Sequence, residues 1–331
     1  MTSMKKKIYV TRQIPEAGIK MLKARKDFDV KVSPYDSVLS AREIVKDAKG
    51  CDALLCLLTD RIDGKILDGI GKQLKIVANY AVGFNNINLE DAKKRGVMVT
   101  NTPGKLISKS VAEHTFALMM GLAKRMVEAD KFMRTGKYKG WGPLLLLGSD
   151  VHDKTLGIVG LGNIGTEVVH RAVNGFGMRV IYTDLKRNRE FEKKYKAKYA
   201  TLPELLKNSD FVTLHVPLLK ATHHLMGAKQ FKMMKKSAFL INTSRGPVVD
   251  EGALVKALKA KELAGVGLDV YECEPKLGCT VFDRNFLRNA QNVIITPHIA
   301  SASFETRSEM SEIAARNIIA ALSGKKPPNL V

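Results

Sequence analysis

The sequence predicts an α/β protein with two doubly wound parallel β-sheets, each in its own domain. Three observations lead to this prediction. Short β-branched or apolar segments alternate with helical segments from end to end, which is typical of parallel sheets covered on both faces. The alternation breaks once, at Asn101-Thr102-Pro103-Gly104, and resumes near Lys154. The length of 331 residues also suits about two domains.

The first series of elements ends near residue 100. Its apolar segments have the length of strands, and the segments between them repeat apolar residues with helical spacing. We expect strands over residues 8–11, 28–32, 53–58, 76–81 and 97–100, and helices over residues 16–23, 40–49, 65–71 and 89–95.

The segment after Gly104 is predicted to form one long helix over residues 111–126. Ser110 and Glu113 have the spacing of a capping box, so we expect the helix to start at Ser110. Because residues 116–122 are apolar nearly all round, we expect this helix to be buried between larger units.

The second series resumes the alternation. We expect strands over residues 156–159, 179–183, 211–216, 238–242, 265–270 and 293–296, followed by an amphipathic helix over residues 303–322. The domain boundaries are expected near Thr102 and Pro297. Residues 1–102 and 298–331 would then form one domain, and residues 103–297 the other.

The composition disfavours several classes of protein. Lysine and arginine number 54 against 33 acidic residues, and the net charge of +21 attracts anions. The cations are scattered and not interleaved with aromatic residues, which favours a generally basic surface over a nucleic-acid site. No apolar run approaches the roughly 20 residues of a transmembrane helix. The run after Lys5-Lys6-Lys7 is too short for a signal peptide.

The cysteines predict neither a disulfide framework nor a metal site. Four cysteines are too few for such a framework in a chain of this length, so we expect a cytoplasmic protein. A zinc ion needs about four ligands. Cys273 and Cys279 have no second Cys or His pair nearby, and Cys51 and Cys56 lie far from them in the sequence.

A glycine-rich hexapeptide indicates a bound dinucleotide. It ends a predicted strand and opens a predicted helix, with the sequence Gly160-Leu161-Gly162-Asn163-Ile164-Gly165. Gly160 permits the tight turn, Gly162 lets the backbone approach a pyrophosphate, and Gly165 lets helix meet strand. The helix N-terminus attracts the phosphates.

The type of dinucleotide depends on the end of the next strand. Asp184 lies 19 residues after Gly165, where a carboxylate would bind the ribose hydroxyls and repel a 2′-phosphate. This favours NAD. Lys186, Arg187 and Arg189 follow at once and could bind such a phosphate, so NADP stays open.

Three later segments carry the groups that reduction of a ketone would need. Arg245 follows one predicted strand, the carboxylates of Asp269, Glu272 and Glu274 follow the next, and His298 follows the last. Open α/β sheets bind ligands at these carboxyl ends of strands. Four other histidines lack such support: His215, His223 and His224 are expected to be structural or surface residues, and His114 a hydrogen-bonded core or interface residue.

The motifs S-R-G-x-x-V-D, L-D-V-x-x-x-E-P and T-P-H-I, in this order after G-L-G-x-I-G, resemble the D-2-hydroxyacid dehydrogenase family over essentially the whole chain. Residues 79–88 and 297–303 are most similar to its glyoxylate/hydroxypyruvate reductase branch. The resemblance implies two Rossmann- or flavodoxin-like domains with the active-site cleft between them. It also implies NAD(P)H-dependent reduction of a small 2-oxo acid to the D-2-hydroxy acid.

The resemblance gives roles to the catalytic groups. Arg245 would hold the substrate carboxylate and carbonyl, since its planar guanidinium suits bidentate binding. His298 would protonate the carbonyl oxygen, and Glu274 would hold the imidazole and favour its protonated form. Glu272 remains a competing partner of His298; Glu274 is preferred because it directly precedes Pro275, as in the family.

Further binding roles are implied in the same way. Backbone N–H groups of Val82 and Gly83 would bind the substrate carboxylate, Ser301 would also contact substrate, and Asp269 would hold the nicotinamide carboxamide. Trp141 either reaches into the neighbour's site of a homodimer or fills a loop or interface. The cofactor channel would be lined by Val216, Pro217, Thr243, Ser244, Arg245, His298 and Ala300.

Two other functions stay open. The chain could be a D-3-phosphoglycerate dehydrogenase or another acid-specific member, with basic groups near the pocket serving a substrate phosphate. It could instead be a dinucleotide-sensing protein like the transcriptional corepressors of this fold, which would use the net charge of +21 for nucleic-acid contact. The intact arginine, glutamate and histidine do not separate these alternatives.

Overall fold

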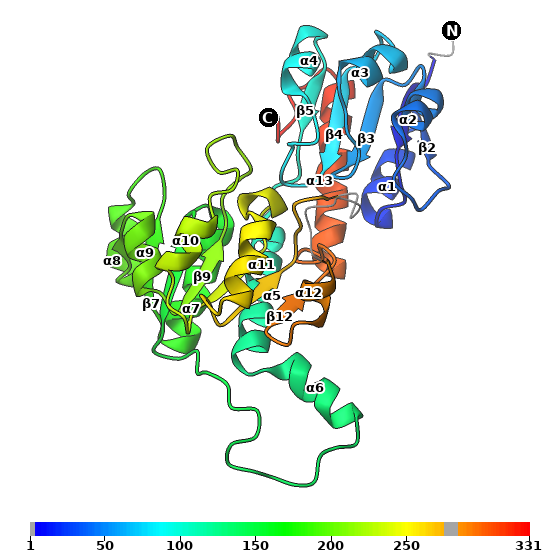
Figure 1. Ribbon diagram of the computed structural model, residues 1–331. Coiled ribbons are helices and arrows are strands. Elements are labelled where there is room, and N and C mark those ends of the chain that lie inside the picture. Colours follow the sequence, from blue (N-terminus) through cyan, green and yellow to red (C-terminus); the bar gives the residue numbers. More distant parts are fainter. Residues whose placement is uncertain (1–3, 275–283) are drawn as a thin grey trace. The chain divides into compact units, whose positions relative to one another are not determined.

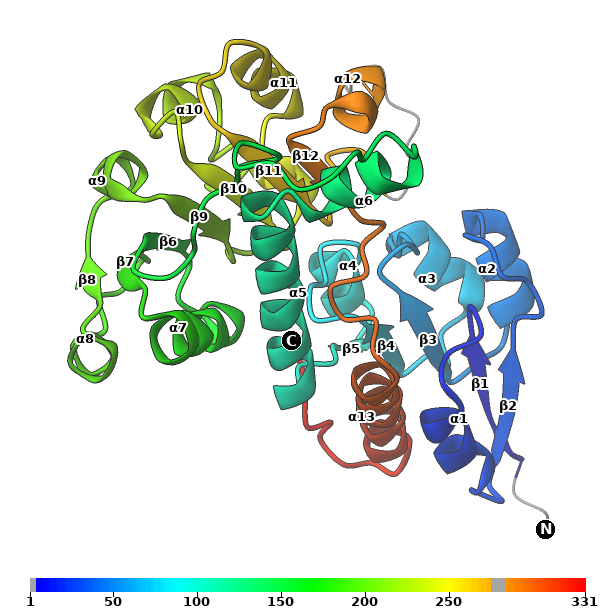
Figure 2. The same ribbon diagram turned by 90° about the horizontal axis from the view of Figure 1, so that it is seen from below.

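The structure is a computed structural model that describes residues 4–274 and 284–331, so Pro275 and Cys279 lie outside the described residues. The chain divides into two compact units (Figures 1 and 2). Unit 1 comprises Met1–Ile107 and Ala302–Val331, and unit 2 comprises Ser108–Ser301. These limits lie a few residues beyond Thr102 and Pro297, where the sequence places the boundaries.

Unit 1 contains a parallel sheet in the order β2-β1-β3-β4-β5, which is the flavodoxin-like order. The expected strands and helices are confirmed, with ends that differ by at most two residues. The strands are β1 (Lys6–Val10), β2 (Phe28–Val32), β3 (Ala53–Leu57), β4 (Ile76–Tyr80) and β5 (Met98–Thr100). The helices are α1 (Glu16–Lys23), α2 (Ala41–Ala48), α3 (Gly64–Ile70), α4 (Leu89–Lys94) and α13 (Phe304–Leu322).

Helix α13 packs closely against α1 because α1 has a glycine, Gly18, at the point of contact. A Cβ at Gly18 would overlap the backbone carbonyl of Ser311, so only glycine allows α1 and α13 to approach this closely. The Ser311 hydroxyl fills the contact, accepting from the Gly18 N–H at 3.0 Å and donating to the Pro15 carbonyl at 2.6 Å.

Unit 2 contains a parallel sheet in the order β12-β11-β10-β9-β6-β7-β8. The strand order reverses between β6 and β9, and such a reversal is where open α/β sheets bind ligands. Its strands are β6 (Thr155–Val159), β7 (Arg179–Thr183), β8 (Lys198–Tyr199), β9 (Phe211–Leu214), β10 (Phe239–Asn242), β11 (Gly265–Leu268) and β12 (Val293–Ile295). Among these strands, only the two-residue β8 was not predicted from the sequence.

The helices around this sheet leave a buried cluster on each face. One cluster lies under α5 (Lys105–Ala123) and α7 (Asn163–Phe176). The other lies under α9 (Leu202–Asn208), α10 (Ala228–Met233) and α11 (Glu251–Lys259). The remaining helices are α6 (Met126–Arg134), α8 (Arg189–Tyr195), α12 (Arg284–Asn289) and the 3-10 turn Gly246–Val248. Within the described ranges, no helix is long and apolar enough to cross a membrane.

The predicted start of the long helix is wrong. α5 begins at Lys105 rather than at Ser110, so Ser110 lies inside the helix and caps nothing. Its hydroxyl donates instead to the carbonyl of Ala300 at 3.0 Å. The physical reason is that residues 105–109 contain no helix breaker, so the helix starts directly after Pro103-Gly104. It ends at Ala123 because Arg125 adopts a left-handed φ of 52°.

Candidate active site

The glycine turn after β6 has two packed positions and one open position. Gly160 has a φ of 95°, and a Cβ there would press on the carbonyl group of His215. A Cβ at Gly165 would overlap the carbonyl oxygen of Gly160, so α7 rests directly on the turn. A Cβ at Gly162, in contrast, would meet no atom within 4 Å. Gly162 therefore borders open space, where a ligand can reach the backbone.

The first turn of α7 suits an anion. Gly162 is the N-cap of this 14-residue helix and, within the described residues, no side chain makes a capping hydrogen bond to it. The N–H groups of the first turn and the helix dipole are thus directed at the open space beside Gly162. This geometry fits the pyrophosphate of a dinucleotide.

A pocket of about 600 Å³ lies beside this turn, at the end of β7. Asp184 lines it and accepts a hydrogen bond from the Leu161 N–H at 2.6 Å. Arg187 is committed elsewhere, because it pairs with Glu192 at 2.7 Å. The other predicted cations, Lys186 and Arg189, also line the pocket. A carboxylate suited to ribose hydroxyls and cations suited to a phosphate therefore share one pocket.

Arg245 is positioned by the turn that follows β10. The Asn242 side chain accepts from the Ser244 N–H at 3.0 Å and donates to the Arg245 carbonyl at 3.0 Å, which folds the chain back. The guanidinium donates to the Ser244 carbonyl at 2.6 Å. Burial lowers the pKa of Arg245, and the nearby charge of Glu274 partly offsets this effect. The guanidinium stays charged.

His298 and Glu274 form a hydrogen-bonded pair. His298 Nδ1 lies 2.6 Å from Glu274 Oε2, and each side chain is about one-quarter exposed or less. The second oxygen of Glu274 accepts from the Tyr271 N–H at 3.0 Å. Because a carboxylate binds Nδ1–H, Nε2 is the ring nitrogen that can face a substrate. Glu272, the competing partner in the sequence, lies 2.6 Å from His224 Nε2 instead.

The backbone of His298 is strained and is held by Asp269. His298 has a φ of 56°, which is uncommon for a residue with a side chain. The fully buried Asp269 carboxylate follows β11 and accepts from the next two N–H groups, those of Ile299 and Ala300, both at 2.8 Å. Asp269 thus anchors the turn that presents the imidazole.

Two side chains complete the surroundings of Asp269. The Thr296 hydroxyl donates its one proton to Asp269 Oδ1 at 2.6 Å. The same hydroxyl therefore accepts from His114 Nε2–H, which lies 3.0 Å away. Burial raises the pKa of Asp269, but hydrogen bonds from His114, Thr296, Ile299 and Ala300 outweigh it. The pKa of this carboxyl lies below its ordinary value, and it is an anion at neutral pH.

The loop after β4 in unit 1 holds the other predicted substrate-binding residues. The Asn79 side chain donates to the Gly83 carbonyl at 2.9 Å, and the Asn101 side chain donates to the Val82 carbonyl at 2.7 Å. Asn86 supports the arrangement by accepting from Asn79 at 3.1 Å. Two side-chain amides therefore fix the backbone of Val82 and Gly83.

Comparison with known proteins identifies the family. Residues 116–300 match the model of the D-isomer specific 2-hydroxyacid dehydrogenase NAD-binding domain. The chain is 48% identical to a glyoxylate reductase of Korarchaeum cryptofilum, over 99% of this chain and 96% of that protein. It belongs to the D-2-hydroxyacid dehydrogenase family.

Solved structures agree with this assignment. D-lactate dehydrogenase from Aquifex aeolicus, complexed with NAD and lactic acid, has a TM-score of 0.86 and 31% identity, covering 98% of each chain. An NADPH-dependent glyoxylate/hydroxypyruvate reductase from Sinorhizobium meliloti, with NADP and malonate, has a TM-score of 0.84 and 27% identity, covering 99% of this chain and 97% of that one. The family resemblance and the fold predicted from the sequence are confirmed, and this dehydrogenase is an NAD(P)-dependent oxidoreductase.

The remaining predicted cofactor and substrate residues of this dehydrogenase follow the same strands. Val216 and Pro217 come after β9, Thr243 and Ser244 after β10, and Ala300 and Ser301 after β12. Because all these strands are parallel, the residues share the carboxyl edge of the sheet with Gly160, Arg245, Glu274 and His298. Thr243 is fixed there by the Thr115 hydroxyl at 3.0 Å.

Two histidines of this dehydrogenase have the structural roles that the sequence predicts, whereas several buried contacts were not predicted. His114 is hydrogen-bonded, as predicted, and burial lowers the pKa of His215 to about 3, so His215 is neutral. No sequence pattern predicted Glu251 or the anchoring contacts of Asp269, because these link segments far apart in the chain. Cys273 takes part in a disulfide bond, which the sequence did not predict.

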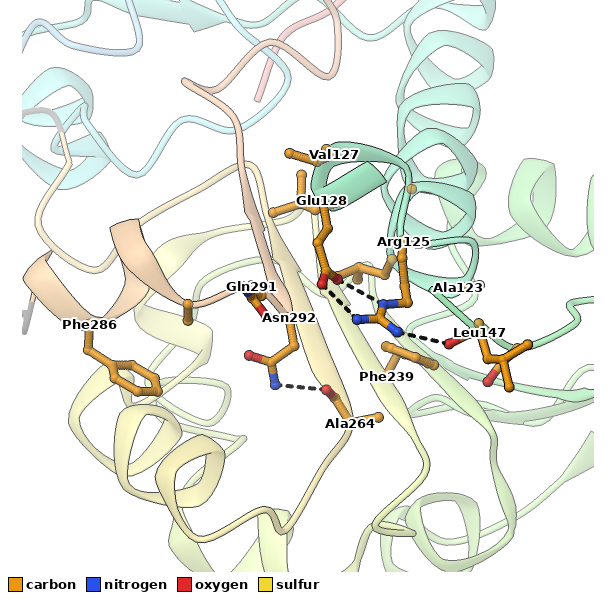
Figure 3. A pocket seen from close by; sticks show the side chains of 16 residues that line it. Ala123, Arg125, Val127, Glu128, Leu147, Phe239, Ala264, Phe286, Gln291 and Asn292 are labelled. Atoms are coloured by element: carbon orange, nitrogen blue, oxygen red, sulfur yellow. Dashed lines mark hydrogen bonds and ion pairs between the residues drawn. The ribbon is translucent and has the colours of Figure 1, made fainter. Parts of the chain in front are cut away.

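A second pocket, of about 530 Å³, lies at the opposite edge of the sheet (Figure 3). Its lining includes Phe239 at the start of β10 and Ala264 just before β11, so it is remote from the carboxyl edge. Figure 3 shows Arg125 turned toward Glu128, with which it pairs at 2.6 Å. This pocket contains none of the predicted site residues.

Proposed function

We propose that this dehydrogenase reduces a small 2-oxo acid of the glyoxylate or hydroxypyruvate type to the D-2-hydroxy acid, using NADH or NADPH. The observation that carries the proposal is the His298–Glu274 pair, which lies at the same sheet edge as Arg245 and the glycine turn. The relative of 48% identity, a glyoxylate reductase, supports the choice of substrate.

In the proposed reaction, bound NAD(P)H supplies a hydride to the carbonyl carbon. Arg245 binds the substrate carboxylate and orients the carbonyl group, and burial strengthens this interaction. His298 donates the Nε2 proton to the carbonyl oxygen, and Glu274 stabilises the imidazolium before transfer. In the reverse direction, neutral His298 takes the proton from the hydroxyl group.

The binding roles follow the same proposal. Unit 1 would bind substrate, with the N–H groups of Val82 and Gly83 meeting the carboxylate and Asn79 and Asn101 holding their carbonyls. Unit 2 would bind the cofactor, since it contains the matched NAD-binding domain. Asp184 would bind the ribose and Asp269 the nicotinamide carboxamide, and Ser301 would contact substrate. The cofactor would also contact the turn Gly160, Leu161, Gly162, Asn163, Ile164 and Gly165, and Val216, Pro217, Thr243, Ser244 and Ala300.

We further propose a homodimer that works in the cytoplasm. Helix α6 and the chain after it project from the rest of unit 2 (Figure 1). This arm exposes Trp141 at 84%, Leu144 at 80% and Leu147 at 61%, a run of large apolar side chains that a second copy would cover. Light scattering coupled to gel filtration would give twice the mass of 36.5 kDa, and a monomer would contradict the proposal.

The function is tested by following oxidation of NADH and NADPH with glyoxylate, hydroxypyruvate, pyruvate and 3-phosphohydroxypyruvate. We expect the first two substrates to have the highest kcat/KM, and His298→Ala to lower kcat by about 100-fold or more. His152→Ala is the matched control, because His152 is exposed and, within the described residues, pairs only with Asp150 and Asp153. Preference for the phosphorylated acid would indicate a D-3-phosphoglycerate dehydrogenase. DNA binding without turnover would indicate a corepressor-like protein.

A further inference from the structure

We propose that Glu251 is a positioning residue for the His298–Glu274 pair, because it fastens the segment that carries Glu274 to the first turn of α11. The proposal rests on the proposed function, in which this pair donates the proton. Glu251 belongs to none of the binding or catalytic roles assigned above, yet its side chain is buried, with the residue only 2% exposed.

The fastening consists of two reciprocal hydrogen bonds. The Glu272 N–H donates to Glu251 Oε1 at 2.5 Å, and the Glu251 N–H donates to Glu272 Oε2 at 3.3 Å. We call this pair of contacts the 251–272 clasp. It joins the start of a helix to the segment after β11, and Asp250 caps that helix separately by accepting from the Ala253 N–H at 2.8 Å.

The clasp reaches the catalytic pair through Tyr271. The Tyr271 N–H, one residue before the clasped N–H of Glu272, donates to Glu274 Oε1 at 3.0 Å. The Tyr271 hydroxyl donates to the Thr296 carbonyl at 2.7 Å, two residues before His298. A displacement of the Glu272 backbone would therefore move both Glu274 and its contact with the imidazole.

The segment that carries the clasp is packed on two sides. A Cβ at Gly246 would overlap the carbonyl carbon of Tyr271, so the Arg245 turn lies directly on the segment. On the other side, Glu272 Oε1 lies 2.6 Å from His224 Nε2, and the His224 N–H donates to the Pro247 carbonyl at 2.8 Å. The clasp thus lies within a continuous set of contacts from Arg245 to Glu274.

The clasp also brings several titratable groups together. The charges of Glu272 and Glu274 act on Glu251, Glu251 acts on the Tyr271 hydroxyl, and the His224 imidazole contacts Glu272. Burial, followed by the charges of Glu272 and Glu274, raises the pKa of Glu251 to about 7. A neutral amide would form the same backbone contact without this repulsion.

The test compares Glu251→Ala, Glu251→Gln and the control Asp250→Ala, which weakens the same helix start but removes neither hydrogen-bonding group of the clasp. We expect Glu251→Ala to lower kcat for glyoxylate about tenfold or more, with KM changed less than about threefold. Glu251→Gln should keep most of the wild-type kcat, because its amide oxygen can accept the same hydrogen bond from the Glu272 N–H. Asp250→Ala should keep the wild-type kcat.

A readout without turnover separates this proposal from the proposed function. Amide hydrogen exchange over residues 269–274 should be about tenfold faster in Glu251→Ala than in the wild type or Asp250→Ala, in protein without nucleotide. Unchanged exchange or a wild-type kcat in Glu251→Ala, or a Glu251→Gln variant as impaired as Glu251→Ala, would overturn the positioning role. Absence of 2-oxo acid reduction by the wild type would overturn the proposed function alone, since the exchange result would still stand.

Discussion

Two buried carboxylates hold the proposed proton donor, and they differ in charge. Asp269 and Glu251 are 0% and 2% exposed, and each fixes one of the two segments that meet in the His298–Glu274 pair. The pKa of Asp269 lies below its ordinary value, whereas that of Glu251 is raised to about 7. Burial raises both, so the neighbours make the difference: donors surround Asp269, and carboxylates surround Glu251.

The two carboxyls therefore have different roles. Asp269 is a permanent anion that holds the strained His298 turn at any working pH. Glu251 changes charge at neutral pH and holds a segment that contains no such strain. Removing the charge of Asp269 should therefore lower activity more than removing that of Glu251. Only the Glu251 carboxyl, while it is present, should make the stability of the protein depend on pH near neutrality.

Asp269→Asn should have the largest effect. An asparagine presents one NH₂ group toward N–H donors, so at least one hydrogen bond to the turn is replaced by repulsion. We expect a loss of about 3 kcal/mol in transition-state stabilisation, or about 100-fold in kcat/KM for glyoxylate. Steady-state kinetics and circular dichroism check this. Near-wild-type activity in a folded variant would remove Asp269 from the account.

Glu251→Gln should stabilise the protein at alkaline pH. The pKa of Glu251 is about 7 in the folded state against 4.5 when unfolded, so folding favours the protonated form. Wild-type stability is then lost as pH rises from about 4.5 to 7, by up to about 3 kcal/mol. The variant lacks this loss, so its advantage over wild type should be small at pH 5 and full at pH 8.

Urea unfolding at the two pH values measures this difference. Glu262→Gln is the matched control, because Glu262 lies in unit 2 outside the clasp and should show no comparable change. An advantage of equal size at pH 5 and pH 8 would mean that Glu251 does not titrate between them.

Thr296→Val should change the free energy less than either carboxylate substitution, about 1 kcal/mol against about 3 kcal/mol. It removes one donor to Asp269 and leaves His114 beside the carboxylate, at 3.5 Å. Loss of one hydrogen bond of about 1 kcal/mol predicts a drop in kcat of about fivefold. Thr306→Val, a buried threonine in unit 1, serves as the control for the substitution itself. A loss as large as that of Asp269→Asn would show that the Thr296 hydroxyl, not the carboxylate, holds the turn.

The sequence predicted which candidate groups lie at one edge of the sheet better than it predicted the contacts that hold them. Arg245, Glu274 and His298 could be found because each follows an apolar strand, and parallel strands bring such ends to one edge. The roles of Asp269 and Glu251 depend on backbone N–H groups of Ile299, Ala300 and Glu272, which no side-chain pattern reveals.

Local patterns also misled in one place. The Ser110–Glu113 spacing matches a capping box, but the helix extends back to Lys105 because nothing in the preceding turn opposes it. The strands, in contrast, were placed to within two residues, since their apolar segments have clear ends. Local signals therefore define the elements of the sheets, while helix ends and buried polar contacts depend on the folded structure.

The most direct test of the central claim is a crystal structure with NAD and an unreactive 2-oxo acid analogue such as oxamate. The account predicts that His298 Nε2 and the Arg245 guanidinium both lie about 3 Å from the same analogue, with Glu274 still bound to Nδ1. An analogue that contacts Arg245 while the imidazole lies beyond about 5 Å, or points away from it, would contradict the claim that His298 donates the proton.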